Sequence, residues 1–414
     1  MSRLGCVADD FTGATDLAGN LAATGRRVVV TVGPDDRPPK DADAVVVALK
    51  SRTVPPEEAV AACLDAHRKL TRAGFDRIWF KYCSTFDSTA RGNIGPVTDA
   101  LLEATGAPWT IACPAFPAGG RTVYQGHLFV GDRLLSESGM RHHPLTPMTD
   151  PDLVRVMGAQ SRYRVGLLPH RVLRSGETAA RDHVSDLVSK GVRVVVTDAL
   201  DGHDLSVIER LTRDLPLITG GSGLALSLPP VRPGAAAARV RSAPGPLAVL
   251  AGSVSDTTVA QIRHARSLLP HRLLSVGDLV RSPKATVAHA VAWAAAHLDA
   301  GRDVLLYSAD DHAQVRAAQE AYGVERSAQA AERALADCAR ALACRGVRRF
   351  LVAGGESSGA VVEALGVSRL RIGPAIAPGV SWTEATHGGH TLNLVLKSGN
   401  FGAEDLFTTA QDVL

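Results

Sequence analysis

The chain has 414 residues and a formal net charge of only +3, with 45% hydrophobic and 21% charged residues. This length exceeds the size at which one hydrophobic core keeps growing, so we expect two domains. Aromatic residues are sparse and no long run of lysine or arginine occurs. The composition therefore argues against a nucleic-acid partner and against a membrane-surface partner.

Six cysteines are scattered along the chain without a CxxC pair or a zinc-like Cys/His spacing. We expect buried free thiols in a reducing compartment. The first apolar run meets Asp9 and Asp10 at once, so it does not resemble the apolar region of a signal peptide. No window approaches the roughly 18 uninterrupted apolar residues of a membrane span. We therefore expect a cytoplasmic protein.

Short β-branched segments alternate with longer helical patterns in the first half of the chain. Continuous apolar strands joined by helices predict a mostly parallel sheet covered on both faces. The predicted strands are Leu4–Ala8, Val28–Val32, Ala44–Leu49, Ile78–Lys81, Thr110–Cys113 and Val192–Thr197, and the predicted helices include Leu17–Ala23, Glu57–Ala73 and Gly95–Thr105.

A Pro/Ala/Gly-rich stretch, residues 229–246, has no apolar periodicity and is typical of a linker. The α/β pattern then restarts, with predicted strands Leu247–Ala251, Val304–Tyr307 and Phe350–Ala353 and predicted helices Thr286–Ala300 and Ser327–Cys344. The expected organisation is a first domain over 1–230, a linker over 231–246 and a second domain over 247–414. The fold class is α/β, with two domains that each contain a mostly parallel sheet flanked by helices.

Ligands of open parallel sheets bind at the carboxyl ends of the strands, and the segment Ala8–Asp16, ADDFTGATD, follows the first predicted strand. Paired carboxylates there can hold a divalent cation or accept the proton of a substrate hydroxyl. Alternatively, Asp10 or Thr12 caps the following helix. Taken alone, the Asp9–Asp10 pair supports both interpretations equally.

The segment Lys81–Pro96, KYCSTFDSTARGNIGP, also follows a predicted strand and is dense in polar side chains. It suits a polyhydroxylated anion, with a cation for the carboxylate and hydroxyls for the hydroxyls. The alternative is a Ser/Thr-rich turn before a helix that begins near Pro96. The candidate substrate-binding residues here are Lys81, Ser84, Asp87, Ser88 and Arg91.

Two further segments follow predicted strands of the first domain. Arg52 is a candidate anion clamp, or else a solvated surface arginine. The segment Cys113–Thr122, rich in proline and glycine, either walls the substrate site or forms only a tight turn, and the turn is slightly favoured.

Three segments of the second domain are rich in small residues: Gly252–Thr258, Gly354–Gly359 and Lys397–Gly402. We call them corners, and together they favour a nucleotide site. Glycine lets the backbone approach a phosphate, and a helix N-terminus offers free N–H groups to it. None matches a Walker A or GxGxxG motif, and a glycine turn capped by Ser357 or Ser358 is the alternative. The candidate nucleotide-binding residues are Ser253, Ser255, Gly354, Gly355, Glu356, Ser357 and Gly399.

Histidine and lysine usage adds two observations. His142, His143, His387 and His390 lack metal-ligand spacing on one helix, so we expect surface or loop positions and name no metal ligand. The basic residues are mostly arginine. A retained lysine such as Lys81 or Lys397 is therefore worth noting, because a compact ammonium and a planar guanidinium do different work.

Five segments in this order resemble the four-carbon acid sugar kinase family nearly end to end: ADDFTGATD, KYCSTFDST with GNIGP, GGESSGAVV, GPAIAPGVSW and LKSGNFG. The wording of the second segment is most similar to that of the 3-oxo-tetronate kinases. Relatives that act on D-threonate or D-erythronate usually differ there. The chain departs from the family at Ala375, where Glu or Gln is common, and at Ser381, where Pro is common.

This resemblance implies a sugar-acid-binding first domain, an ATP-binding second domain, and transfer of the γ-phosphoryl group to a C4 hydroxyl in sugar-acid catabolism. It also implies ATP and Mg²⁺ as cofactors, and a homodimer is a candidate assembly. We expect Asp10 or Asp9 to orient the attacking hydroxyl and Lys81 and Arg52 to bind the carboxylate. A D-threonate or D-erythronate 4-kinase is the nearest alternative. An NAD-dependent dehydrogenase or a non-catalytic sugar-acid sensor is the alternative of another class.

Overall fold

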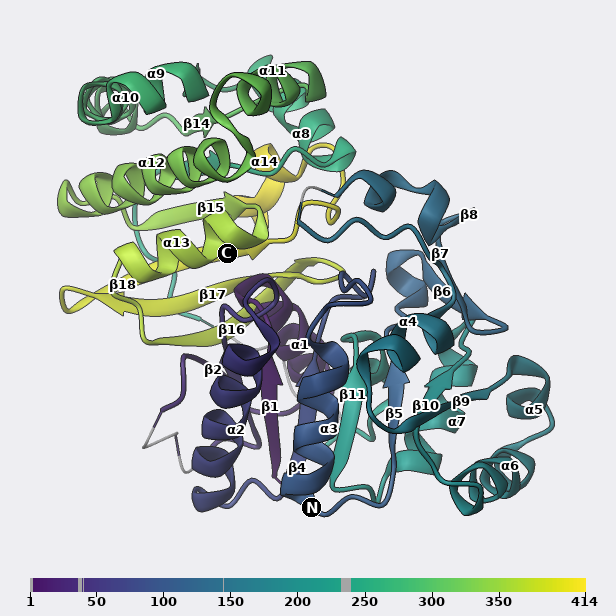
Figure 1. The fold of residues 1–414 in the computed structure, drawn as a ribbon. Helices are drawn as coiled ribbons and strands as arrows, with labels where there is room; N and C mark the ends of the chain where they lie inside the picture. The colour runs from purple at the N-terminus through teal and green to yellow at the C-terminus, as the bar shows by residue number, and fades with distance from the viewer. Residues whose placement is uncertain (1–2, 36–38, 40, 144, 232–239) are drawn as a thin grey trace. The chain divides into compact units, whose positions relative to one another are not determined.

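The structure is a computed structural model that describes residues 3–35, 39, 41–143, 145–231 and 240–414. The chain divides into two compact units, Met1–Ala236 and Ala237–Leu414, each an α/β unit (Figure 1). The sequence-based prediction of two α/β domains with mostly parallel sheets is confirmed. Within the described residues, no helix is long and apolar enough to cross a membrane.

The first unit contains a fully parallel sheet in the order β2-β3-β1-β4-β11-β5-β10-β9. Figure 1 shows helices on both of its faces. Because the strands are buried on both faces, they are near-continuous apolar runs. The strands are β1 (Leu4–Ala8), β2 (Val28–Val32), β3 (Ala44–Ala48), β4 (Arg77–Lys81), β5 (Thr110–Cys113), β9 (Arg164–Leu168), β10 (Val192–Thr197) and β11 (Leu217–Gly220).

The helices of this unit follow the strands as crossover connections. Helix α2 shows the local rules: Pro56 stands at its first turn with Glu57, and Lys69 and Arg72 stand in its last turn, where the helix dipole favours them. The helices are α1 (Phe11–Ala23), α2 (Pro56–Arg72), α3 (Ile94–Thr105), α4 (Leu153–Gln160), α5 (His170–Arg174), α6 (Glu177–Ser189) and α7 (Gly202–Thr212).

Two predictions for the first unit need correction. Helix α1 begins at Phe11 rather than Leu17, because Asp10 caps it, so Asp16 lies on the helix. The region after β5 is more than a turn: it contains a small antiparallel sheet of β6 (Arg121–Tyr124), β7 (His127–Val130) and β8 (Arg133–Leu134).

The second unit has a parallel part in the order β13-β14-β12-β15-β18, to which β17 and then β16 add antiparallel. The antiparallel strands were not predicted. The strands are β12 (Leu247–Ala251), β13 (His271–Leu273), β14 (Val304–Tyr307), β15 (Arg349–Ala353), β16 (Arg369–Ala377), β17 (Val380–His387) and β18 (His390–Lys397). The helices are α8 (Asp256–Arg266), α9 (Val276–Arg281), α10 (Pro283–Asp299), α11 (His312–Tyr322), α12 (Val324–Cys344), α13 (Gly355–Ala364) and α14 (Leu406–Thr409).

The core of the second unit forms around fully buried Trp382 of β17, whose indole Nε1 donates to the Ala410 carbonyl at 2.7 Å. The predicted linker falls partly on residues 232–239, which lie outside the described residues. Its described end packs against the sheet of the second unit: the backbone N–H of Ala243 donates to Asn393 Oδ1 at 2.6 Å. Residues from 240 onward therefore belong to the second unit.

The cysteines, two of the histidines and the two departures from the family pattern have defined positions in the structure. All six cysteines are free, but Cys344 is exposed and Cys83 only partly buried, so burial is not general. His387 and His390 face each other at the ends of β17 and β18, and His387 Nδ1 lies 2.7 Å from the Leu365 carbonyl. The two departures from the family pattern, Ala375 and Ser381, are cross-strand partners on β16 and β17.

Candidate active site

In the first unit, the strand order itself assembles the predicted acceptor site. Strands β3, β1 and β4 are parallel neighbours, so the segments that follow them meet at one edge of the sheet. The loop after β3 carries Arg52, that after β1 carries Asp9 and Asp10, and that after β4 carries residues 82–93. The backbone ties the three together, since the Asp9 N–H donates to the Lys81 carbonyl at 3.0 Å and the Ser51 N–H to the Asp9 carbonyl at 2.9 Å.

Arg52 is the centre of a buried ionic cluster. Its Nε and Nη2 donate to the two carboxylate oxygens of Asp9 at 2.9 and 2.8 Å, and Nη2 also donates to Asp10 Oδ1 at 2.7 Å. Its Nη1 lies 3.6 Å from Asp87 Oδ2. Arg52 is therefore not a solvated surface arginine. It neutralises and orients three carboxylates, two of which are the predicted catalytic residues.

Asp10 is both a helix cap and a member of this cluster. Its Oδ1 accepts from the Gly13 N–H at 2.8 Å and its Oδ2 from the Thr12 hydroxyl at 2.6 Å. Burial acts to raise the pKa of Asp10, but Arg52 and Lys81 together with these two hydrogen bonds lower it. Asp10 is therefore held ionised by its surroundings. The two interpretations left open by the sequence are compatible.

Asp9 behaves differently from Asp10 although the two are adjacent. Burial raises the pKa of Asp9, and its bidentate pair with Arg52 only partly opposes this effect. Paired carboxylates whose environments push their pKa values apart are a common feature of acid–base sites.

Lys81 and Asp16 form a second, looser buried pair. Lys81 is 2% exposed, and its Nζ donates to the Tyr82 carbonyl at 2.9 Å and lies 3.9 Å from Asp16 Oδ2. A side chain at Gly13 would come within 3.0 Å of Lys81 Nζ and within 2.3 Å of Asp10 Oδ1. Glycine at this position therefore lets the two charged groups approach the helix N-terminus.

The sequence-based search missed Asp16 as a candidate. Burial raises the pKa of Asp16 to about 6, against the attraction of Lys81. Its Oδ1 is buried and has no hydrogen-bond partner within the described part of the chain. Placing the start of helix α1 at Phe11 would have shown Asp16 to be the one charged residue of a largely buried helix.

The segment after β4 adopts an unusual backbone. Phe86 and Asp87 have φ angles of 65° and 49°, in the left-handed region that non-glycine residues seldom occupy, and such strain tends to occur at functional sites. Buried Phe86 packs edge-to-face on Tyr82, which anchors the turn. Asp87 Oδ1 accepts from the Thr85 hydroxyl at 2.6 Å. The turn thereby directs Asp87 toward Arg52.

The remaining predicted residues of this segment have different positions. Ser84 and Ser88 are buried, and Ser88 Oγ accepts from Gln160 Nε2 at 3.0 Å. Arg91 is exposed, and within the described residues no contact joins its side chain to the cluster. Asn93, which was not predicted, donates from Nδ2 to the carbonyls of Ser51 and Val54 at 2.7 and 3.1 Å and so fixes the loop that carries Arg52.

In the second unit, the three predicted corners also meet at one edge, because β12, β15 and β18 are parallel neighbours. Small residues are required where the corners touch. A side chain at Gly252 would come within 2.1 Å of Ser357 Oγ, and one at Gly399 within 2.4 Å of Ser253 Oγ and 2.8 Å of Ser255 Oγ. The three corners together therefore form one closely packed set of backbone and hydroxyl groups, which we call the second-unit corner.

The N-terminus of helix α13 is not capped by a serine. Gly354, with φ of 125°, is the cap residue and offers no side-chain hydrogen bond, so the alternative with Ser357 or Ser358 as the cap is wrong. The first N–H groups of α13 have no intrahelical partner and are suited to an anion. Ser255, by contrast, caps α8 by accepting from the Thr258 N–H at 3.3 Å.

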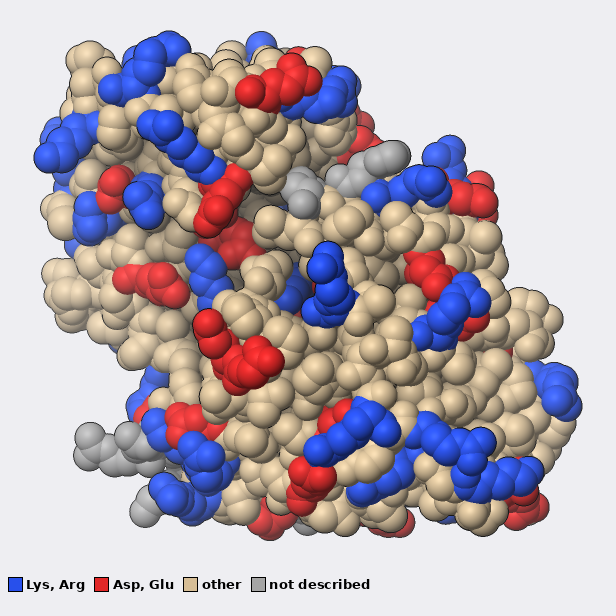
Figure 2. Space-filling model, in the orientation of Figure 1, with Lys and Arg blue, Asp and Glu red and all other residues tan. Residues whose placement is uncertain are grey.

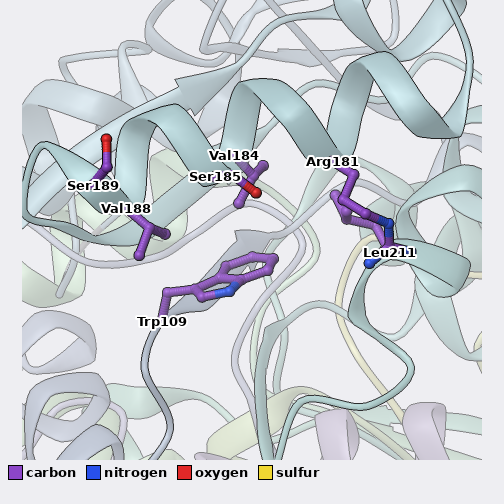
Figure 3. Close-up of a pocket in the computed structure, with 7 residues that line it drawn as sticks. All are labelled: Trp109, Arg181, Val184, Ser185, Val188, Ser189 and Leu211. Atoms are coloured by element: carbon purple, nitrogen blue, oxygen red, sulfur yellow. The ribbon is translucent and has the colours of Figure 1, made fainter.

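The surface of the described residues carries charges of both signs (Figure 2) and a hollow in the first unit. On the face shown in Figure 2, residues of both charge signs are interspersed. A hollow of about 350 Å³ in the first unit lies beside Trp109, the residue before β5, and therefore near the amino end of that strand rather than at the site (Figure 3). Its lining is Trp109, Arg181, Val184, Ser185, Val188, Ser189 and Leu211.

Comparisons with known proteins agree with this division. Residues 4–228 match a family model described as a sugar-binding N-terminal domain, and residues 248–407 match one described as a nucleotide-binding C-terminal domain. A Burkholderia multivorans protein named 3-oxo-tetronate kinase is 50% identical over 98% of this chain and 96% of its own length. A protein of the same name from Cupriavidus necator is 51% identical over the same shares. A solved structure from Salmonella typhimurium LT2 is 42% identical, covers 99% of both chains and has a TM-score of 0.86.

Proposed function

Since this chain belongs to the four-carbon acid sugar kinase family, we propose that it transfers the γ-phosphoryl group of ATP to the C4 hydroxyl of 3-oxo-tetronate. It is a kinase with a sugar-binding N-terminal and a nucleotide-binding C-terminal domain, which removes the dehydrogenase and sensor hypotheses. The observation that carries the choice of substrate is the identity of about half the residues, over nearly the whole chain, to proteins named 3-oxo-tetronate kinase.

The acceptor would bind at the cluster after β1, β3 and β4. Phosphoryl transfer depends mainly on positioning and on neutralising charge. The Arg52 guanidinium holds Asp9 and Asp10 in fixed orientations, and one of these carboxylates would orient the attacking hydroxyl and accept its proton. Lys81 supplies positive charge for the substrate carboxylate, and Ser84, Asp87 and Ser88 supply hydrogen bonds to the hydroxyl groups.

Arg52 has a narrower role in this proposal than the sequence suggested. Its Nε and Nη2 are engaged by Asp9 and Asp10. It therefore acts on the substrate chiefly by positioning these carboxylates. Arg91, being exposed, would contact the substrate only if its side chain turned inward.

The nucleotide would bind at the corner after β12, β15 and β18. The uncapped N-terminus of α13 and the hydroxyls of Ser253, Ser255 and Ser357 can donate to phosphate oxygens, and Gly354, Gly355 and Gly399 allow close approach. Glu356, in the first turn of α13, would lie at the edge of this site. Acceptor and donor sites on different domains must come together for transfer, which also excludes water.

Mg²⁺ fits this proposal as a companion of the nucleotide rather than as a resident metal. Within the described residues, no group of three or more His, Cys, Asp and Glu side chains could hold a metal ion. Mg²⁺ commonly keeps several waters and binds through phosphates and one or two carboxylates. When bound, it would neutralise charge on the phosphates.

An ATP-coupled assay of the purified chain tests the function. The panel is 3-oxo-tetronate, D-threonate and D-erythronate, each with and without Mg²⁺. We expect the highest kcat/KM with 3-oxo-tetronate. A clear preference for D-threonate or D-erythronate would change the proposed substrate but leave the proposed reaction intact. Absence of ATP turnover with all three sugar acids would refute the proposed function. A homodimer, the candidate assembly, is tested by light scattering.

A further inference from the structure

Lys397, the last residue of β18, is a fully buried lysine at the centre of the second-unit corner. Its side chain is 0% exposed. It is paired with Ala353 of β15 across the sheet, and its carbonyl accepts from the Gly354 N–H at 2.9 Å. Lys397 therefore lies directly beneath two of the segments to which the nucleotide is assigned.

The ammonium of Lys397 makes three hydrogen bonds, all to neutral oxygens. Nζ donates to Thr258 Oγ1 at 2.9 Å and to the carbonyls of Ser398 and Gly399 at 3.0 and 2.8 Å. The Thr258 hydroxyl in turn donates to the Gly399 carbonyl at 2.8 Å. These bonds hold the first turn of α8 to the turn that follows β18.

Within the described residues, no acidic side chain forms an ion pair with the buried ammonium of Lys397. The acidic residues on the segments around Lys397 include Asp256 on α8, Glu356 on α13, and Glu404 and Asp405 after β18. Asp256 Oδ1 lies 2.9 Å from His312 Nε2. Burial consequently lowers the pKa of Lys397 to about 7. A buried lysine without a counter-charge is costly and is seldom retained for stability alone.

We propose that Lys397 is a positioning residue for nucleotide binding, which holds the Ser398–Gly399 turn against α8 and supplies the positive charge that the polyphosphate neutralises. This rests on the proposed function, because it requires the nucleotide to bind at this corner. Direct contact between Nζ and a phosphate is not required for this role. An anion held by the N-terminus of α13 and the nearby hydroxyls interacts strongly with a cation in the same low-dielectric region.

The charge and the hydrogen bonds make separate predictions. A bound polyphosphate favours the ammonium form, so it raises the pKa of Lys397 above about 7. The complex then holds a proton that the free protein loses above that pH. By linkage, the contribution of Lys397 to nucleotide affinity weakens as the pH of the solution rises from about 7 to about 9.

The test is calorimetric binding of a non-hydrolysable ATP analogue to the full chain, without sugar acid. Lys397→Met keeps the length of the side chain but removes its charge and its donors, and Lys397→Gln keeps a donor without the charge. We expect Kd to rise about tenfold or more for the Met variant, from loss of charged hydrogen bonds. The KM for the sugar acid should stay within about twofold, because that site belongs to the other unit.

A second readout is the pH dependence of the same binding. The ratio of the variant Kd to the wild-type Kd should shrink between about pH 7 and pH 9, because the wild type progressively loses its charge. Comparing ratios cancels the ionisation of the nucleotide itself. If Lys397→Gln retains most of the affinity and the ratio does not change with pH, the hydrogen bonds rather than the charge carry the effect, and the charge half of the proposal is overturned.

If the Lys397 variants do not fold, Thr258→Val provides the test instead. It removes the hydroxyl that links Lys397 to the Gly399 carbonyl and keeps the shape, and we expect several-fold weaker nucleotide binding. Thr212→Val is the matched control, because Thr212 is equally buried but its hydroxyl donates only to carbonyls within α7 of the first unit. Nucleotide affinity within about twofold of wild type in Lys397→Met and Thr258→Val would overturn the proposal. Failure of the wild type to bind the analogue would instead refute the proposed function.

Discussion

The guanidinium of Arg52 engages both carboxylate oxygens of Asp9, through Nε at 2.9 Å and Nη2 at 2.8 Å. The same Nη2 reaches Asp10 Oδ1 at 2.7 Å. This planar two-point geometry is available to arginine and not to lysine. One partly buried arginine therefore sets the orientation of both acidic residues to which the chemistry is assigned.

Replacing Arg52 should disrupt both stability and catalysis. Arg52→Met leaves the buried Asp9 and Asp10 without their partner, and breaking a buried pair in this way costs about 3–5 kcal/mol. Arg52→Lys restores charge but not the two-point geometry, so we expect partial recovery of stability with a low kcat. Urea unfolding and steady-state kinetics measure the two effects. Arg68→Met removes an exposed pair with Asp65 and should change the free energy of unfolding by less than about 1 kcal/mol. Equal losses in the two Met variants would refute the special role of Arg52.

Asp10→Asn separates the capping role from the chemical role. Asparagine is a good helix cap and can still accept from the Gly13 N–H, so stability should change little through the cap itself. Loss of a general base lowers kcat by about 10²-fold or more. Asp311→Asn is the matched control, because Asp311 caps α11 by accepting from the Gln314 N–H at 2.8 Å and is remote in sequence from the predicted site residues. Near-normal turnover of Asp10→Asn would rule out Asp10 as the base.

Gly399→Ala should weaken nucleotide binding. The new methyl group would come within 2.4 Å of Ser253 Oγ and 2.8 Å of Ser255 Oγ, so one or both hydroxyls must move. We expect the KM for ATP to rise about tenfold and the KM for the sugar acid to remain near its original value, as measured by varying each substrate in turn. Gly202→Ala, where a methyl group would meet nothing within 4 Å, should leave both constants unchanged. An unaltered KM for ATP would remove the turn after β18 from the site.

Asp16 should make stability depend on pH in a defined direction. Its pKa is raised to about 6, so the folded protein keeps a proton there that the unfolded chain releases near 3.8. The stability contribution of this group therefore falls as pH rises from about 4 to about 6. Asp16→Asn removes that dependence, so the Tm of the variant relative to wild type should increase from about pH 5 to about pH 7.5. A difference that stays constant or shrinks would show that pairing with Lys81 outweighs burial.

Much of the sheet architecture could be predicted because buried parallel strands are near-continuous apolar runs. Val28–Val32 and Val192–Thr197 have the predicted bounds. Strands β16 and β17 could not be predicted in the same way, because they add antiparallel to one edge and contain Gly373, Pro374 and polar residues. Here pairing with β18 decides the structure, and this information is not local in the sequence.

The site was predictable as a set of segments but not as a set of contacts. Segments that follow strands were identified because ligands bind at strand carboxyl ends. The sequence could not show that Arg52 would face Asp9 rather than solvent, since this depends on β3 lying beside β1. It also could not show that Lys397 would be buried beneath the nucleotide corner without a counter-charge.

The most direct test of the account is the position of the new phosphate. The chain is incubated with ATP, Mg²⁺ and 3-oxo-tetronate, and the product is examined by phosphorus NMR with coupling to hydrogen. Transfer to the C4 hydroxyl predicts a phosphate-ester signal split into a triplet by the two hydrogens on C4, and its loss in Asp10→Asn. A doublet, which would place the phosphate on a carbon with one hydrogen, or the formation of inorganic phosphate alone, would contradict the account.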